Sequence, residues 1–259
     1  MLVTRPLLMV VALALSLGVS QVEGLRVVSY NIKHGRGNDN VVDLERTARV
    51  LRALSPDIVG LQEVDDLATR SGGVPQADRL GQLLGLHHAF GRFMDFQGGA
   101  YGMAILSRHP IVRTESVRLP DGNEPRVALA VDVLLPGDRR ITIVNVHFDW
   151  VGDDGFRFAQ AMALTTYLDA LKTPYVLLGD FNDEPESRTL ALFKRRATEA
   201  RKPEGDRLTF SSTEPTKEID FIFTAPAAAW RAREVRVITE PVASDHRPLL
   251  AVLELAPGR

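Results

Sequence analysis

Apolar runs of strand length alternate with amphipathic segments of helical length along most of the chain. Runs rich in branched and aromatic residues predict strands over residues 25–32, 57–64, 102–107, 126–135, 140–148, 175–179, 219–224, 234–237 and 249–255. Apolar residues near helical spacing predict helices over residues 41–54, 77–86, 156–172 and 187–195. Strands outnumber helices, and hairpins mix with crossovers. The pattern favours an α/β fold in which two mixed β-sheets pack face to face with helices outside.

The first residues have the pattern of a secretory signal peptide, which we predict over residues 1–24. Arg5 supplies a positive charge, residues 7–19 are mostly apolar, and small residues follow up to Gly24. The apolar run is shorter than the ~20 residues that a spanning helix needs. The alternative to a cleaved signal peptide is an uncleaved membrane anchor. No second hydrophobic span follows. The mature chain is therefore predicted to be secreted or periplasmic, without a transmembrane span.

Composition limits the classes of function that remain. The chain of 259 residues suits a single large domain, predicted over residues 25–259. Its formal net charge of −2 provides no basic field to attract nucleic acid. A nuclease is still compatible with this charge, because a bound cation can bridge the protein to phosphate. The absence of cysteine excludes disulfides and thiolate metal sites.

Polar or ionisable side chains stand at the ends of six predicted strands or beside them. They are Asn31, Glu63, His147, Asp180 with Asn182, Asp220, and Asp245 with His246. Each one alone has an ordinary explanation as a turn residue or a solvated surface residue. Six such features at strand margins are hard to explain in that way. They indicate a common site, because ligand-binding and catalytic groups gather where strands end and loops begin.

Several of these segments, in this order, resemble the signature blocks of the endonuclease/exonuclease/phosphatase superfamily. The blocks are Ser29-Tyr30-Asn31-Ile32, Leu61-Gln62-Glu63-Val64, Gly179-Asp180-Phe181-Asn182, Ile219-Asp220-Phe221-Ile222 and Ser244-Asp245-His246-Arg247-Pro248-Leu249. The superfamily includes deoxyribonucleases, abasic-site endonucleases, neutral sphingomyelinases and inositol-polyphosphate 5-phosphatases. The resemblance extends from Leu25 to Leu255. It implies a four-layered α/β sandwich and a metal-dependent hydrolase that cleaves phosphate esters.

The expected cofactor is Mg²⁺ or Mn²⁺. Mg²⁺ commonly takes one or two carboxylates together with water and phosphate oxygens. Glu63 is the first choice for the metal carboxylate. By resemblance, Asn31 lies beside it and binds metal or phosphate, and Asp245 is a further ligand, directly or through water.

A histidine that works on a phosphate needs a partner to hold its tautomer, and Asp220 and His246 supply that pair, as in the superfamily. His246 would act as the general base or as a cation facing the scissile phosphate. Asp180 is the competing base, with Asn182 orienting water or a phosphoryl oxygen, and His246 is slightly preferred. His147 falls where deoxyribonucleases and sphingomyelinases carry a second histidine. It would protonate the leaving group or contact the phosphate.

Two further residues are candidates for substrate binding. Tyr101 precedes another block resembling the superfamily, although a core aromatic is an equally good interpretation. Arg108 is a candidate phosphate contact, with a solvated arginine as the alternative. Glu218 stands where many relatives have a basic residue, which puts a local phosphate contact in doubt. Three histidines without an evident partner are expected at the surface: His34, His87 and His88.

The substrate is a nucleic acid, a phospholipid head group or a sugar phosphate, as a diester or a monoester. Nothing in the sequence indicates a protein partner. A non-catalytic binding protein on the same scaffold is the alternative, because a fold does not determine a function. The full set of ionisable residues favours the enzyme, since a binding protein has no need of the Asp220–His246 pair.

Overall fold

The computed structural model describes residues 24–257 of the chain. The predicted signal peptide lies outside the described residues, apart from Gly24. Within residues 24–257, no helix is both long enough and apolar enough to span a membrane.

The described chain forms two six-stranded sheets. The first has the order β11 (Trp230–Val237), β12 (Leu249–Leu255), β1 (Leu25–Asn31), β2 (Ile58–Asp66), β4 (Gly99–Ser107), β3 (His87–Phe96). The second has the order β5 (Ile111–Arg118), β6 (Val127–Leu135), β7 (Arg139–His147), β8 (Tyr175–Asp180), β10 (Asp220–Ala225), β9 (Thr198–Glu199). Strands β1 and β2 are parallel, as are β7 and β8, and the other neighbours are antiparallel. Both sheets are therefore mixed.

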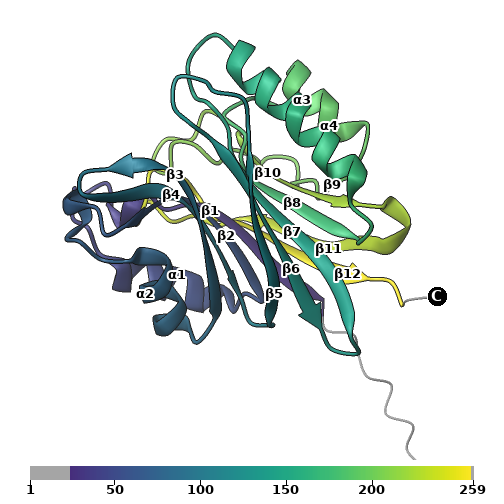
Figure 1. Ribbon diagram of the computed structural model, residues 1–259, viewed down its shortest axis with the longest axis horizontal. Helices are drawn as coiled ribbons and strands as arrows, with labels where there is room; N and C mark the ends of the chain where they lie inside the picture. The colour runs from purple at the N-terminus through teal and green to yellow at the C-terminus, as the bar shows by residue number, and fades with distance from the viewer. Residues whose placement is uncertain (1–23, 258–259) are drawn as a thin grey trace, which may run out of the picture.

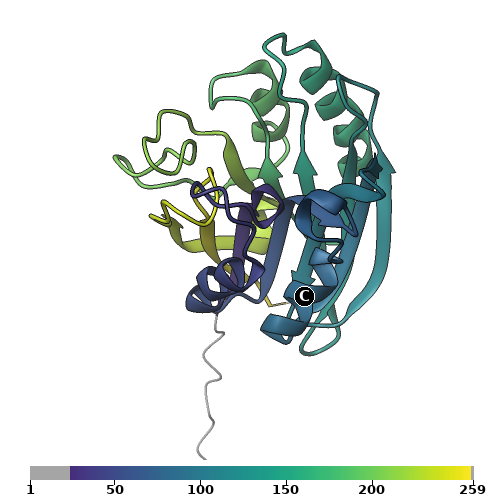
Figure 2. The same cartoon turned by 90° about the vertical axis from the view of Figure 1, so that its left-hand side faces the viewer.

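Two pairs of helices cover the outer faces of the sheets. They are α1 (Leu44–Leu54) with α2 (Gln76–Leu84), and α3 (Gly155–Ala170) with α4 (Arg188–Lys194). Figure 1 shows the first pair on one side of the sandwich and the second pair on the other, and Figure 2 views the molecule from the side of α1 and α2. Short 3₁₀ helices span Lys33–Gly35, Thr69–Ser71 and Ala227–Ala229. The predicted four-layered α/β sandwich is confirmed.

Three hydrophobic clusters hold these layers together. The central one lies between the two sheets and includes Ile105, Leu129 and Ile143. The second lies between the β5–β9 sheet and the α3/α4 pair, and the third between the β11–β3 sheet and the α1/α2 pair. Burial of these apolar faces is the main favourable term in the stability of the fold.

Helix α1 shows why the predicted boundaries need adjustment. The helix was expected over residues 41–54, but it begins at Leu44 because the Asp43 side chain accepts a hydrogen bond from the backbone N–H of Arg46 at 2.9 Å. Val41 and Val42 stay exposed before this cap. At the other end, Ser55 adopts a left-handed conformation. Pro56 follows, and it cannot continue a helix.

The strands that the sequence analysis missed lie at sheet edges. Strands β3, β5 and the two-residue β9 were not predicted, and β11 begins at Trp230, four residues before its predicted start. Most residues of β5 are exposed or half-buried, so they carry charged and polar side chains. An edge strand needs little apolar sequence, and charge there discourages pairing with other chains.

The topology brings the predicted site residues to neighbouring positions. In the parallel β1–β2 pair, Asn31 stands opposite Gln62. In the second sheet, Asp180 stands opposite His147 on one side and Asp220 on the other. Strand ends that are remote in sequence thus meet at one end of the sandwich.

Candidate active site

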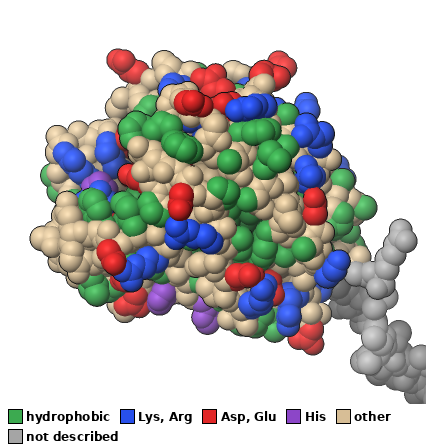
Figure 3. Space-filling view, turned by 45° about the horizontal axis from the view of Figure 1, so that its top comes forward, with side chains coloured by type: hydrophobic (Ala, Val, Ile, Leu, Met, Phe, Trp, Pro, Cys, Tyr) green, Lys and Arg blue, Asp and Glu red, His purple; other side chains and the backbone are tan. Residues whose placement is uncertain are grey.

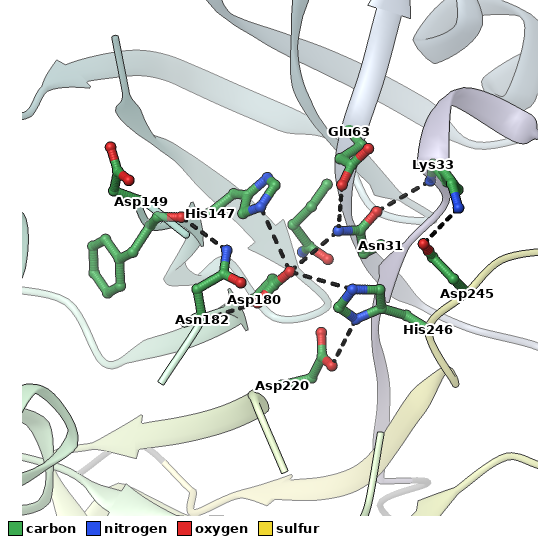
Figure 4. Close-up of polar contacts among 12 residues, drawn as sticks. Asn31, Lys33, Glu63, His147, Asp149, Asp180, Asn182, Asp220, Asp245 and His246 are labelled. Atoms are coloured by element: carbon green, nitrogen blue, oxygen red, sulfur yellow. Dashed lines mark hydrogen bonds and ion pairs between the residues drawn. The ribbon is translucent and has the colours of Figure 1, made fainter. Parts of the chain in front are cut away.

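A cleft of about 800 Å³ opens at this end of the sandwich. Seven predicted site residues line it: Glu63, Tyr101, His147, Asp180, Asn182, Asp245 and His246. Asn31 and Asp220 are buried behind them and hydrogen bond to lining residues (Figure 4). The structure therefore brings together nine of the residues that the sequence indicated, and one, Arg108, lies elsewhere.

A β-bulge in strand β2 places Glu63. Leu61 pairs with Ala104 and Val64 with Gly102, so two residues of β2 oppose a single residue of β4. Glu63 is one of those two residues, and its φ of +55° is unusual for any residue except glycine. Such strained backbone is maintained at functional sites, where it directs a side chain to a required position.

Asn31 links the two sheets across the floor of the cleft. Its amide nitrogen Nδ2 lies 3.0 Å from Glu63 Oε1 and 3.2 Å from Asp180 Oδ2. Its Oδ1 accepts a hydrogen bond from the backbone N–H of Lys33 at 3.1 Å. Asn31 thus fixes the spacing between the carboxylate of the first sheet and that of the second.

Glu63 has features expected of a cation ligand. Burial raises the pKa of its carboxyl group above the usual range, and the hydrogen bond from Asn31 partly offsets this effect. Among residues 24–257, no lysine, arginine or histidine forms an ion pair with it. A desolvated carboxylate is costly unless it is paired. Its oxygens, together with Oδ1 of Asn31, are hard donors of the kind that Mg²⁺ and Mn²⁺ prefer, so the donor set fits such an ion.

Asp245 also lines the cleft and already has a cationic partner. Its Oδ2 accepts from Lys33 Nζ at 2.7 Å, and both side chains are partly exposed. The loop that carries Asp245 is fixed to strand β1, because Ser244 Oγ donates to the carbonyl oxygen of Asn31 at 2.7 Å. Asp245 would therefore have to share its charge between Lys33 and a metal ion.

His246 and Asp220 form the pair that the sequence predicted. The ring Nδ1 of His246 lies 3.0 Å from Asp220 Oδ2, and Nε2 lies 3.6 Å from Asp180 Oδ2. Burial acts to lower the pKa of His246, but Asp220 and Asp180 outweigh it and raise the pKa to about 10. The Phe210 ring packs against the imidazole, with 4.9 Å between ring centroids. The two acidic neighbours therefore favour the protonated form of His246.

Asp180 is at the centre of the site, between the two histidines (Figure 4). Burial is the main cause that raises the pKa of its carboxyl group to about 7, with the nearby Asp220 acting in the same direction and His246 opposing it. One atom each from Asp180, Asp220 and His246 lies within 4.8 Å of the others, a spacing that a metal could use. Because His246 directs one nitrogen at each acidic side chain, however, these residues are arranged as an ion group in which Asp220 is hydrogen bonded to His246.

Asn182 is oriented by its own hydrogen bonds. Its backbone N–H donates to Asp180 Oδ1 at 2.9 Å, and its Nδ2 donates to the carbonyl of Phe148 at 3.0 Å. No donor within residues 24–257 reaches its Oδ1, which can therefore accept a hydrogen bond from water or a ligand.

His147 has a neighbour that the sequence analysis missed. The guanidinium Nη1 of Arg126 lies 3.3 Å from His147 Nδ1, and its Nη2 donates to Glu124 at 2.9 Å. Arg126 is only 1% exposed although it lines the cleft. In the sequence it stands at the predicted start of a strand, where an arginine is usually solvated, and only its place before an apolar run could have marked it.

Tyr101 satisfies both interpretations that the sequence left open. It lines the cleft and is buried, and its ring makes an edge contact with Phe93 at 5.6 Å between centroids. The guanidinium of Arg70 lies 5.1 Å from the Tyr101 ring centroid and is held by the buried carboxylate of Asp65. Arg70, Phe96 and Tyr101 line the cleft together.

Arg108 is not in the cleft. Its Nε donates to Asp57 Oδ1 at 2.8 Å and its Nη2 to the carbonyl of Pro56 at 3.1 Å, beside Gly24. The interpretation as a phosphate contact therefore has no support in the geometry. Its partner Asp57 directly precedes β2, remote in sequence from Arg108, and the sequence motif does not reveal that pairing.

Two other expectations also change. His34, expected at the surface, is 8% exposed, and burial lowers its pKa to about 4, whereas His87 and His88 are exposed as predicted. Glu218 does not face the substrate side. It is buried in ion pairs with Lys202 and Arg207, both at 2.9 Å.

Comparison with known proteins agrees with this geometry. The model of the Endonuclease/Exonuclease/phosphatase family matches residues 28–246. The chain belongs to the endonuclease/exonuclease/phosphatase family, and it is a hydrolase of phosphate esters.

Three similar proteins illustrate the relationship. The uncharacterized protein YbhP of Escherichia coli (strain K12) is 27% identical over 219 residues, which cover 79% of this chain and 86% of YbhP. The crystal structure of an endonuclease/exonuclease/phosphatase from Beutenbergia cavernae DSM 12333 has a TM-score of 0.73 at 26% identity, covering 90% of this chain and 72% of that one. The mannosyl-6-phosphatase of Bacteroides thetaiotaomicron VPI-5482 shares the fold, with a TM-score of 0.72 at 20% identity, covering 88% and 99%.

Proposed function

We propose that this protein is an exported, divalent-metal-dependent phosphoesterase that hydrolyses a phosphodiester or phosphomonoester by in-line attack of water. The observation that carries the proposal is the convergence of Asn31, Glu63, Asp180, Asp220 and His246 in one cleft. A binding protein would need no such set of coupled acids and bases.

Glu63 and Asn31 would hold the cation, with Asp245 as a further ligand. Their oxygen donors suit Mg²⁺ or Mn²⁺, and the carboxylate of Glu63 has no other cationic partner among the described residues. When bound, the ion would neutralise charge that develops on the phosphoryl oxygens. Asn31 would keep the ion site at a fixed distance from Asp180, because it hydrogen bonds to both carboxylates.

Asp180 is the proposed general base, whereas the sequence analysis slightly preferred His246. A base must have an open position for a proton, and His246 lies between two carboxylates that favour its protonated form. His246 would then act as a cation facing the phosphate, with Asp220 fixing its orientation. Asp180 would take the proton of the attacking water, and Oδ1 of Asn182 would accept a hydrogen bond from that water.

A small phosphate ester is the class of substrate that the surface favours. The formal net charge is −2, and basic and acidic side chains are interspersed on the face seen in Figure 3, so that face offers no extended basic track for a nucleic-acid backbone. Phe96, Tyr101 and the exposed Trp150 line the cleft and can pack against a ring. The mannosyl-6-phosphatase with the same fold is consistent with a sugar phosphate.

Turnover of chromogenic esters tests the enzyme directly. The full-length mature protein should hydrolyse bis(4-nitrophenyl) phosphate or 4-nitrophenyl phosphate with Mg²⁺ or Mn²⁺, and a chelator should abolish the reaction. Glu63→Gln and His246→Ala should lose turnover while their circular dichroism spectra stay unchanged. Arg108→Ala, outside the cleft, is the control and should keep full activity. Activity that persists with excess chelator, or in both site variants, contradicts the proposal.

Export is a separate part of the proposal and rests on the pattern of residues 1–24. Expression of the full chain in a bacterial host should give a shortened protein in the periplasm or medium. N-terminal sequencing should place the cleavage between Ser20 and Gly24. Full-length protein retained in the cytoplasm would contradict it.

A further inference from the structure

Arg126 and His147 form a buried pair beside the proposed catalytic groups. Arg126 precedes strand β6 and His147 ends strand β7, so the sheet itself sets their approach. The guanidinium group is enclosed by Glu124, by His147 Nδ1 at 3.3 Å, and by the Phe93 ring, whose centroid is 5.0 Å from the guanidinium carbon. Neither residue is more than 4% exposed.

The donor chemistry of arginine determines the tautomer of this histidine. A guanidinium group has five N–H donors and no acceptor, and it stays protonated in proteins. Nδ1 of His147 can hydrogen bond to it only through a lone pair. The proton of the neutral ring must then be on Nε2, which lies 3.5 Å from Asp180 Oδ2 on the cleft side.

The charges around His147 also oppose a second proton. Burial is the largest cause that lowers its pKa well below the ordinary value, and the cations of Arg126 and His246 act in the same direction. Two carboxylates face the pair, Asp180 toward Nε2 and Glu124 toward Arg126. Because Glu124 is bound to the guanidinium, it does not offer Nδ1 an acceptor.

We propose that Arg126 is a positioning residue that holds His147 as a neutral imidazole with its single proton on Nε2, so that His147 donates a hydrogen bond to a phosphoryl oxygen. The leaving group then receives its proton from water and not from His147. The tautomer follows from the contacts alone, whereas the role in turnover rests on the proposed function. This assigns one of the two roles that the sequence left open for His147.

Nitrogen NMR of the histidine rings tests the tautomer without any turnover. In ¹⁵N-labelled mature protein with Mg²⁺ near neutral pH, the ring of His147 should show an unprotonated Nδ1 and a protonated Nε2. His147→Gln assigns the signal by its loss. Arg126→Lys keeps a donor-only partner and should keep this pattern, whereas Arg126→Gln, which also offers an acceptor, should give a mixture of tautomers. A proton on Nδ1, or on both nitrogens, in the unaltered protein overturns the proposal even if a variant fails to fold.

Two esters with different leaving groups test the role in turnover. Bis(4-nitrophenyl) phosphate releases a good leaving group that needs no proton, whereas diphenyl phosphate releases a poorer one. The amide of His147→Gln can still donate a hydrogen bond, so the rate losses for the two esters should agree within about threefold. Loss of a general acid would slow hydrolysis of the phenyl ester at least ~10-fold more than that of the nitrophenyl ester. That larger loss overturns the assigned role. If the unaltered protein acts only on monoesters, 4-nitrophenyl phosphate and phenyl phosphate replace this pair. If it hydrolyses none of the four esters with metal, the proposed function fails, and the NMR result still decides the tautomer.

Discussion

The two sides of the cleft differ in whether their charged side chains find partners of opposite charge within the protein. On one side, Asp180, Asp220 and His246 contact one another, and each charge has an opposite charge within 3.6 Å. On the other side, Glu63 receives one hydrogen bond from Asn31 and has no ion pair among residues 24–257. The ionisable groups of the first side are already partnered by one another within the fold. The second is the side that a cation would complete, and this contrast indicates which residues serve proton transfer and which serve metal binding.

Replacing one carboxylate on each side by its amide should separate proton transfer from metal binding. We expect these replacements to have the largest effects on activity. Glu63→Gln should abolish binding of Mn²⁺ in calorimetry and lower turnover below detection. Asp180→Asn should keep Mn²⁺ binding but lower kcat by ~10²–10⁴-fold at saturating metal, because a general base contributes about that much. Equal loss of Mn²⁺ binding in both variants would mean that the two sides are a single metal site.

Asp220→Asn tests whether turnover depends on the ion pair between Asp220 and His246. The amide keeps the shape of the side chain but removes the charge that orients His246 and favours its protonated form. We expect kcat to fall by ~10²–10³-fold with unchanged Mn²⁺ affinity, less than the loss in Asp180→Asn, because the partner acts through the histidine. A variant with unaltered kcat would show that His246 needs no partner.

A polar link through the core should set the distance between the two sides. The Asn145 amide donates to the carbonyls of Leu61 and Ala104 at 2.9 and 3.0 Å, and its Oδ1 accepts from Gln62 Nε2 at 2.7 Å. Asn145 lies two residues before His147, and Gln62 directly precedes Glu63. The contacts therefore connect the sheets just below the cleft.

Asn145→Ala should destabilise the protein by about 2–4 kcal/mol, because it leaves several buried polar groups without partners. Urea denaturation followed by circular dichroism measures this loss. Thr142→Ala, in the same strand, is the matched control, since the Thr142 hydroxyl bonds to Asp132 of β6 and to Thr173 and not to the first sheet. A smaller loss for Asn145→Ala than for this control would argue against a link between the sheets.

The sequence predicted the sandwich, and it indicated nine residues that the fold brings together, for a physical reason. Buried strands must be apolar, so polar residues such as Glu63 and Asp180 stand out where those strands end. Edge strands β3 and β5 carry no such constraint and were missed. Arg126 and Arg108 show the limit for charged residues. Both lie near strand ends, but the partner that decides the role of each, His147 or Asp57, is supplied by the tertiary fold.

Gly60 and Gly179 also depend on tertiary packing. A Cβ on Gly60 would lie 2.0 Å from a side-chain atom of Leu178, and one on Gly179 would lie 2.0 Å from the carbonyl oxygen of Val146. These glycines allow the sheets and strands to approach closely beside Gln62 and Asp180. The signature blocks contain Gly179, but the spacing it permits is visible only in the folded chain.

The smallest predicted effect concerns His34, which directly follows the Asn31–Lys33 segment of the metal-binding side. Its pKa is lowered to about 4 by burial, compared with 6.5 for the unfolded chain, so the unfolded state binds more protons below about pH 6.5. Stability should therefore fall as pH decreases from 6.5 toward 4. In His34→Asn, which tolerates the left-handed φ of this position, the loss of stability between pH 7 and pH 5 should shrink by about 1–2 kcal/mol.

Urea titrations at both pH values would measure the His34 effect, with the exposed His87→Asn as the matched control. Because His34 follows the Asn31–Lys33 segment, acid should loosen the metal-binding side before the ion group of Asp180, Asp220 and His246. Amide hydrogen exchange at pH 5 should then be faster in residues 31–36 than in residues 178–182, and His34→Asn should reduce that difference. Uniform exchange in both segments would mean that the two sides lose their structure together.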